Sequence, residues 1–136
     1  MSRVYLDASC IIYLVESASP FHEKVVARLG QYRADPDASV VTSRLSRLEC
    51  RTRPLRDGDA GLLAAYDAFF GADRLMLGEV SGVVIERATE LRARYGFKTP
   101  DAIHLATAIE GRADVLLTGD AALRRCAEVA VEVLEP

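Results

Sequence analysis

The sequence lacks the cysteine and histidine patterns that hold zinc or form a disulfide framework. Its three cysteines, Cys10, Cys50 and Cys126, are an odd number with no CxxC pair, and its two histidines are not at zinc-ligand spacing. Nearby carboxylates would raise the thiol pKa of Cys10 and Cys50 and make both poor nucleophiles. We therefore interpret the cysteines as structural thiols.

Long apolar runs and an excess of basic charge are also missing. No run approaches the ~20 residues that span a bilayer, and the first residues lead directly into an apolar, β-favouring stretch without a signal peptide. We expect a cytoplasmic protein with no membrane association. Lys and Arg number 17 against 20 Asp and Glu, for a net charge of −3, which argues against a general nucleic-acid coat. Any nucleic acid must be held by a local basic patch or through a metal.

Repeats, low-complexity tracts and glycine-rich phosphate loops are absent, and what remains is an ordinary globular composition. The chain has 136 residues, of which 50% are hydrophobic and 27% charged. A chain of this length buries roughly 68% of its unfolded surface, so we predict one domain over residues 1–136. Strand-like and helix-like segments alternate along it, which predicts an α/β fold with a mostly parallel sheet.

The periodicity of apolar residues places the elements. Strands are predicted at 4–6, 39–42, 74–77, 113–117 and 129–133. Helices are predicted at 8–16, 21–34, from 43 to a break near Pro54, from 60 to 70, 82–95 and 99–109, with a short one after 120. In the third helix, Leu45, Leu48 and Thr52 form the expected buried stripe. Thr99 is expected to cap the helix that follows it, with Pro100 at its first position.

Four acidic residues occupy positions at or just after these strands. Asp7 and Asp120 directly follow strands, Glu49 lies on the helix after the second strand, and Asp101 lies in the first turn of a helix that is apolar nearly all round. Ligands of parallel α/β sheets bind beyond the carboxyl ends of the strands. Taken singly, Asp7 and Asp101 are also good helix-capping residues.

Four carboxylates at one place would need compensation. Two of them about 4 Å apart repel by roughly 4 kcal/mol at a protein surface. Shared protons or a hard divalent cation could relieve this, and oxygen-only ligation favours Mg²⁺ or Mn²⁺. Such ions can activate a water and stabilise the leaving oxygen of a phosphodiester. Ser9 and Thr118, each two residues from an acid, could orient a carboxylate or a metal-bound water.

The sequence allows two interpretations for a stripe of arginines and two for a histidine. Arg44, Arg47 and Arg51 form a stripe on one helix, which is either a solvated face or a patch that contacts RNA phosphates. His104 follows Asp101 by one helical turn and is either a satisfied structural residue or a proton-handling group.

In order and context, the four acids resemble those of the PIN-domain nucleases. The matching motifs are Leu6-Asp7-Ala8-Ser9, Leu48-Glu49-Cys50, Thr99-Pro100-Asp101-Ala102-Ile103-His104-Leu105-Ala106 and Leu117-Thr118-Gly119-Asp120. Chain length and the Asp101 motif look most like the VapC toxins of prokaryotic toxin–antitoxin pairs. The last motif departs from the pattern, because many relatives carry Asn where this chain has Gly119.

This resemblance implies a three-layer sandwich with a sheet of about five strands and helices on both faces. It implies a Mg²⁺- or Mn²⁺-dependent endoribonuclease in which Asp7, Glu49, Asp101 and Asp120 are the catalytic, metal-binding acids. The implied partners are an RNA substrate, a cognate antitoxin and a second copy of the chain. The alternative is a PIN-like binding module without catalysis. A phospho-acceptor receiver domain fits less well, because it needs an adjacent acidic pair after the first strand and a lysine after the last.

Overall fold

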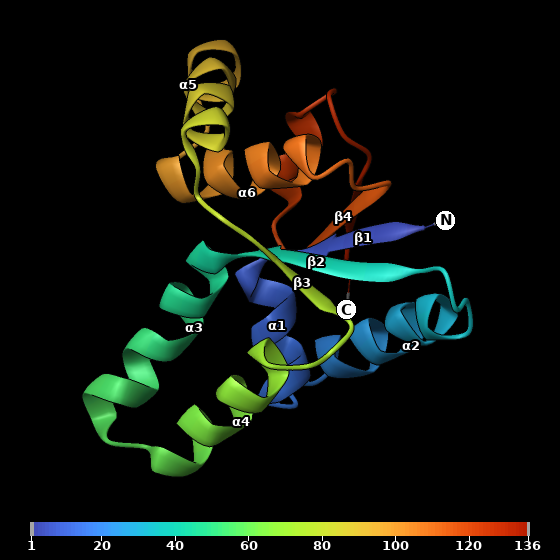
Figure 1. Ribbon diagram of the computed structural model, residues 1–136, viewed down its shortest axis with the longest axis vertical. Coiled ribbons are helices and arrows are strands. Elements are labelled where there is room, and N and C mark those ends of the chain that lie inside the picture. Colours follow the sequence, from blue (N-terminus) through green and yellow to red (C-terminus); the bar gives the residue numbers. More distant parts are fainter. Residues whose placement is uncertain (1, 136) are drawn as a thin grey trace.

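A five-stranded sheet organises the fold, and all of its strands run parallel (Figure 1). The computed structural model describes residues 2–135. The strand order is β3-β2-β1-β4-β5. The strands are β1 Arg3–Leu6, β2 Ser39–Ser43, β3 Leu75–Gly78, β4 Val115–Thr118 and β5 Val131–Val133. The α/β prediction is confirmed, and the sheet is parallel throughout rather than mostly.

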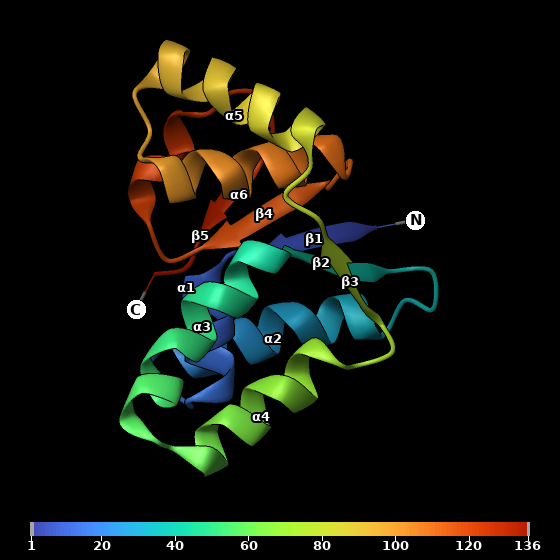
Figure 2. The same cartoon turned by 60° about the vertical axis from the view of Figure 1, so that its left-hand side comes forward.

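Helices cover both faces of the sheet, as the three-layer prediction required. The helices are α1 Ala8–Val15, α2 Phe21–Arg33, α3 Arg44–Asp57, α4 Ala60–Phe70, α5 Gly82–Tyr95 and α6 Thr99–Glu110, followed by a 3₁₀ helix, η1, at Ala121–Arg125. Figures 1 and 2 show α5 and α6 on one face and α1 to α4 on the other. No helix in residues 2–135 is long and apolar enough to cross a membrane.

The central strand β1 supplies side chains to both cores. Val4, Tyr5 and Leu6 are fully buried, and they alternate between the two faces as strand geometry requires. Tyr5 packs in the core under α5 and α6, whereas Val4 and Leu6 pack in the core with α1, α2 and α4. Burial on both faces explains why this strand is a short continuous apolar run.

The helix ends follow local sequence signals in most places. Asp7, Ser43, Asp59, Ser81 and Asp120 each precede a helix and accept a hydrogen bond from a backbone N–H in its first turn. Gly96 ends α5 at φ 73°, a left-handed conformation that favours glycine. These capping residues confirm the predicted starts of α1, α4 and α5 and the predicted end of α5.

Two predictions about α3 are wrong. The helix does not break near Pro54 but continues to Asp57, and Pro54 is itself buried. Pro54 lies in the last turns of the helix, where its missing N–H removes one hydrogen bond and its ring still packs. The buried stripe is Ser46, Cys50 and Pro54, while Leu48 is 63% exposed. Small side chains face the core because α3 approaches the neighbouring helix α1 closely, as the contact between Cys50 Sγ and the carbonyl oxygen of Ala8 shows.

The expected cap of α6 is also wrong by one residue. Lys98 is the N-cap, and its side chain makes no capping hydrogen bond. Thr99 is already helical, and Pro100 follows it within the first turn. Proline tolerates either of these positions because the first N–H groups of a helix have no intrahelical partner. Asp101 stays in the first turn, as predicted.

Candidate active site

Asp7 is an anchored carboxylate at the carboxyl end of β1. Its side chain is only 6% exposed, and Oδ1 accepts hydrogen bonds from Ser9 Oγ at 2.6 Å and from the backbone N–H of Cys10 at 3.1 Å. The Thr118 hydroxyl donates to Oδ2. An ionised carboxylate offers about four lone-pair sites, so these three donors leave capacity for a further ligand. Asp7 therefore caps α1 and still has lone-pair capacity for a further ligand.

The two hydroxyls on Asp7 also hold the loop that carries Asp120. The backbone N–H of Gly119 donates to Ser9 Oγ at 3.0 Å, and that of Asp120 donates to Thr118 Oγ1 at 3.0 Å. Each hydroxyl therefore accepts from one loop amide and donates to Asp7. Ser9 and Thr118, selected in the sequence for their spacing, tie the ends of β1 and β4 into one unit.

Asp101 faces the negative charge of these two acids. Burial raises the pKa of the Asp101 carboxyl, and the charges of Asp120 and Asp7 raise it further, while His104 and Lys98 offset part of this effect. Asp101 lies on α6 and the other two acids follow β1 and β4, so three separate elements bring the carboxylates within electrostatic reach of one another. Ionising Asp101 is therefore less favourable in the protein alone than it is for a carboxyl in water.

Glu49 is held by a different contact. Its Oε1 lies 2.6 Å from His104 Nε2, and the other ring nitrogen of His104 lies 2.6 Å from the Tyr5 hydroxyl. His104 is 3% exposed and Tyr5 is fully buried. The sequence analysis left the role of His104 open and did not select Tyr5. Their spacing from the acids could have indicated both residues, since Tyr5 precedes Asp7 by two residues and His104 follows Asp101 by three.

The acids do not form a ready-made metal cage. Within residues 2–135, no group of three or more His, Cys, Asp and Glu side chains is arranged to hold a metal ion. Glu49 turns toward His104, and Asp7 turns toward its hydroxyl donors. Mg²⁺ usually binds through one or two carboxylates and keeps several waters, so it does not need such a cage. The oxygen-only donors and the unfavourable charge on Asp101 fit a hard divalent cation of this kind.

The three arginines of α3 are engaged in surface ion pairs. Arg44 pairs with Glu79 at 2.8 Å, and Arg47 and Arg51 share Asp67 of α4 at 3.1 and 2.9 Å. All three line an open groove on this face of α3. Exposed ion pairs contribute about 0–1 kcal/mol, so a phosphate could compete for the guanidinium groups. Contact with RNA stays a prediction.

Tyr13 explains why position 119 is a glycine in this chain. A Cβ atom on Gly119 would lie 2.4 Å from the Tyr13 hydroxyl oxygen, which is closer than real contacts allow. The Tyr13 ring stacks on Phe21, with centroids 4.6 Å apart. Burial raises the pKa of Tyr13, and the charges of Asp7 and Asp120 raise it further, so both acids lie within electrostatic reach of the Tyr13 hydroxyl. Tyr13 thus occupies the space that a side chain at position 119 would fill.

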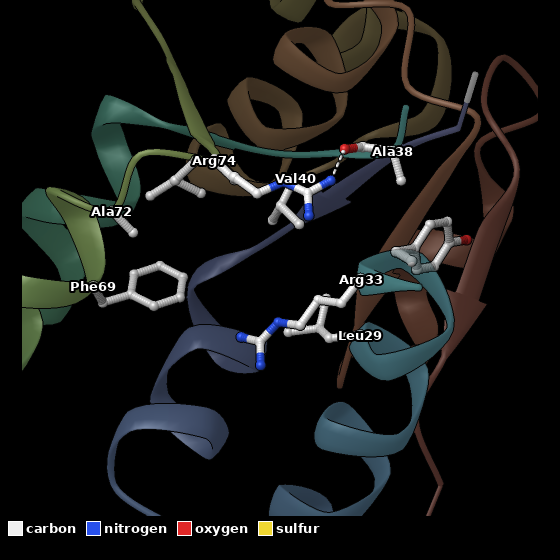
Figure 3. A pocket seen from close by; sticks show the side chains of 9 residues that line it. Leu29, Arg33, Ala38, Val40, Phe69, Ala72 and Arg74 are labelled. Atoms are coloured by element: carbon white, nitrogen blue, oxygen red, sulfur yellow. Dashed lines mark hydrogen bonds between the residues drawn. The ribbon is translucent and has the colours of Figure 1, made fainter. Parts of the chain in front are cut away.

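An apolar cavity lies far from this site along the sheet. It has a volume of about 130 Å³ and lies between α2 and α4, beside the amino ends of β2 and β3 (Figure 3). Leu29, Val40 and Phe69 are among its lining residues, and Arg74 beside it donates to the carbonyl oxygen of Ala38 at 3.0 Å. Because the acids follow the carboxyl ends of the strands, this cavity is separate from the candidate active site.

Comparison with known proteins agrees with this fold. The family model described as the PIN domain matches residues 4–129. VapBC2 from Rickettsia felis, solved bound to a DNA fragment from its promoter, superposes with a TM-score of 0.76 at 15% identity, over 98% of this chain and 99% of that one. VapC20 from Mycobacterium tuberculosis, described as a sarcin–ricin loop cleaving toxin, gives 0.70 at 20% identity, over 93% and 98%. FitAcB from Neisseria gonorrhoeae gives 0.70 at 18%, over 94% and 95%. No curated protein sequence matches the chain.

Replacing Asp101 with Asn tests the charge repulsion at the site. The folded-state pKa of Asp101 is raised, so its ionised form costs stability above that pKa and costs none at pH values below the unfolded pKa, about 3.9. In EDTA at pH 7.5, Asp101→Asn should therefore melt at or above the parent temperature, and the difference should vanish in acid. Asp59→Asn, which changes an exposed cap of α4, is the control and should bring no gain. A clear loss of stability in Asp101→Asn at pH 7.5 would contradict the repulsion.

Replacing Gly119 tests its close approach to Tyr13. Gly119→Ala should lower the free energy of unfolding by about 1–3 kcal/mol, because the added methyl group forces the Tyr13 ring to move. In a Tyr13→Leu background the same change should cost much less. Gly82→Ala is the control, since its Cβ would meet nothing within 4 Å. Equal losses in both backgrounds, measured by urea unfolding, would rule out the steric explanation.

Proposed function

Because this chain belongs to the PIN-domain family, we propose that it is a metal-dependent endoribonuclease that acts as the toxin of a toxin–antitoxin pair in the cytoplasm. The observation that carries the proposal is the charge environment of Asp101, which contains Asp120 and Asp7 at the carboxyl edge of the sheet. The similar structures support the toxin assignment, since they include a toxin described as cleaving the sarcin–ricin loop and a toxin–antitoxin complex from Klebsiella pneumoniae.

Each acid has a distinct part in the proposed site. Asp7, Asp101 and Asp120 are the residues that would hold Mg²⁺ or Mn²⁺, and Glu49 completes the set from α3. When bound there, the cation would supply Lewis acidity toward the phosphate and lower the pKa of a coordinated water. Ser9 and Thr118 fix the orientation of the Asp7 carboxylate through the bonds described above. Chemistry of this kind requires no protein nucleophile.

The alternative function is a PIN-like binding module without catalysis. That role does not require acidic residues at four separate positions, whereas the nuclease proposal uses all four. Cys10 and Cys50, the thiols nearest the acids in sequence, are poor nucleophiles, because burial raises the pKa of both, that of Cys50 to about 12.

The proposed protein partners are an antitoxin and a second copy of the chain. An antitoxin that silences an acidic site would place a basic side chain among Asp7, Asp101 and Asp120. For self-association, α3 and the segment before α5 offer apolar side chains that line one open groove, among them Leu48, Leu55 and Val80. Large exposed apolar side chains grouped in this way are typical of interaction surfaces.

Cleavage assays test the nuclease proposal. The purified protein should cut single-stranded RNA in millimolar Mg²⁺ or Mn²⁺ and should stop in excess EDTA. Asp101→Asn should reduce the rate at least a hundredfold while Asp59→Asn keeps it, because only the first changes the acidic set. Cleavage that persists in EDTA and in Asp101→Asn would refute the metal-dependent mechanism. An inactive parent that still binds a partner would favour the binding module.

Binding of an antitoxin tests the charge complementarity of the site. A basic peptide from the proposed antitoxin should bind the parent more weakly as salt rises, because the contacts are ionic. Asp101→Asn should weaken binding and flatten the salt dependence, and Asp59→Asn should change neither. An affinity that is unaffected by both salt and Asp101→Asn would place the interface away from the acids.

A further inference from the structure

We infer that Tyr5 and His104 form a buried relay that positions Glu49 for the acidic site, so that both are positioning residues of the proposed nuclease. This inference rests on the proposed function. The relay runs from the Tyr5 hydroxyl through His104 Nδ1 and Nε2 to Glu49 Oε1, with both joining distances at 2.6 Å. It is distinct from the four acids themselves and from the hydroxyls that hold Asp7.

The direction of the relay follows from the chemistry of its members. A carboxylate can only accept, so the proton between His104 and Glu49 belongs to Nε2. In a neutral imidazole the other nitrogen, Nδ1, then has no proton and accepts from the Tyr5 hydroxyl. In that neutral form the two contacts select one tautomer of His104 and direct its Nε2–H at Glu49. Removing the Tyr5 hydroxyl would leave His104 Nδ1 as a buried acceptor without this hydrogen bond.

Tyr5 and His104 of the relay are buried, whereas Glu49 at its end is partly exposed to solvent. Tyr5 is fully buried and packs edge-on against the His104 ring, with centroids 5.9 Å apart and the planes at 67°. The His104 side chain is 4% exposed, but that of Glu49 is 30% exposed. The second oxygen of Glu49 is not used by the relay and can accept a further ligand. A fixed inner oxygen and a free outer oxygen are what an oriented metal-ligating carboxylate needs.

The position of the relay in the chain joins the elements that carry the acids. Tyr5 lies on β1 two residues before Asp7, and His104 lies on α6 three residues after Asp101. Glu49 comes from α3. Two hydrogen bonds thus set the relative positions of three acid-bearing elements, including the contact between α3 and α6. A histidine with only a structural role in the core would not need a hydrogen bond to one of the four acids.

The matched pair of variants is Tyr5→Phe and Tyr66→Phe. Both tyrosines are fully buried, and each hydroxyl donates a hydrogen bond: that of Tyr5 to the buried His104, and that of Tyr66 to the half-buried Glu16, away from the site. Each change removes one hydroxyl oxygen and should lower the melting temperature. Only Tyr5→Phe should weaken Mn²⁺ binding measured by calorimetry, by about tenfold, which is the low end for outer-shell changes. It should lower kcat for RNA and leave KM unchanged.

Nitrogen NMR of labelled histidine supplies a readout that needs no metal and no activity. In the parent, one histidine should show a protonated Nε2 and an unprotonated Nδ1, and His104→Gln should remove that signal. Tyr5→Phe should shift the signal toward a mixture of tautomers, whereas Tyr66→Phe should leave it unchanged. A parent signal from the opposite tautomer, with the proton on Nδ1, would overturn the relay.

The outcomes separate this inference from the proposed function. If the parent binds Mn²⁺ and cleaves RNA but Tyr5→Phe behaves like Tyr66→Phe, the relay is overturned and the nuclease proposal stands. If the parent neither binds Mn²⁺ nor cleaves RNA, the proposed function fails and takes the inference with it. If Tyr5→Phe alone loses Mn²⁺ affinity and kcat, and also loses the single tautomer, the relay positions Glu49.

Discussion

The parallel pairing of β1 with both β2 and β4 brings Asp7 and Asp120 to the same end of the sheet, which we call the acidic edge. The rest of the candidate site depends on this constraint. Val4 aligns with Val40 on one side and with Val115 on the other, so these strands end together. The backbone N–H of Asp7 still reaches the carbonyl oxygen of Leu117, at 3.4 Å. Because parallel strands point the same way, every residue that follows a strand is delivered to one edge. Residues far apart in the chain thereby become neighbours.

The acids gathered at this edge are held in different ways. Asp7 has two hydroxyls and a backbone amide directed at it, and Glu49 has a histidine. Asp101 instead lies in the field of two other negative charges. In the proposed nuclease, a site with some carboxylates fixed by hydrogen bonds and another with a raised pKa would be prepared for a cation. Relief of the repulsion at Asp101 would then contribute to the binding free energy of that cation.

Sequence reasoning reached the architecture because the signals are local. A short apolar run followed at once by Asp7, or by Thr118-Gly119-Asp120, marks a strand end, and Ser81 and Gly96 mark the limits of α5. It failed on α3 because hydrophobicity alone selects Leu48 for the core. The structure instead buries Ser46 and Cys50, since close helix packing favours small side chains.

The contacts within the site could be predicted only in part. Spacing from the acids was enough to select Ser9 and Thr118, which do contact Asp7. No local pattern indicates that Tyr5 and Glu49 meet at His104, because these residues are separated by tens of positions and meet only once the sheet and α6 have packed. The collision between Tyr13 and a side chain at position 119 is likewise a tertiary fact, although the glycine itself was visible as a departure.

The pairing of β1 with β4 also bears on when the protein becomes able to act. Asp7 and Thr118 are separated by 111 residues, and β1 is the central strand although it comes first. A ribosome adding about 5–20 residues per second needs on the order of ten seconds to progress from one residue to the other. Throughout that time the apolar β1 has no partner on its β4 side, and Asp7 lacks the Thr118 donor. The acidic edge therefore cannot form in the nascent chain until β4 has been synthesised.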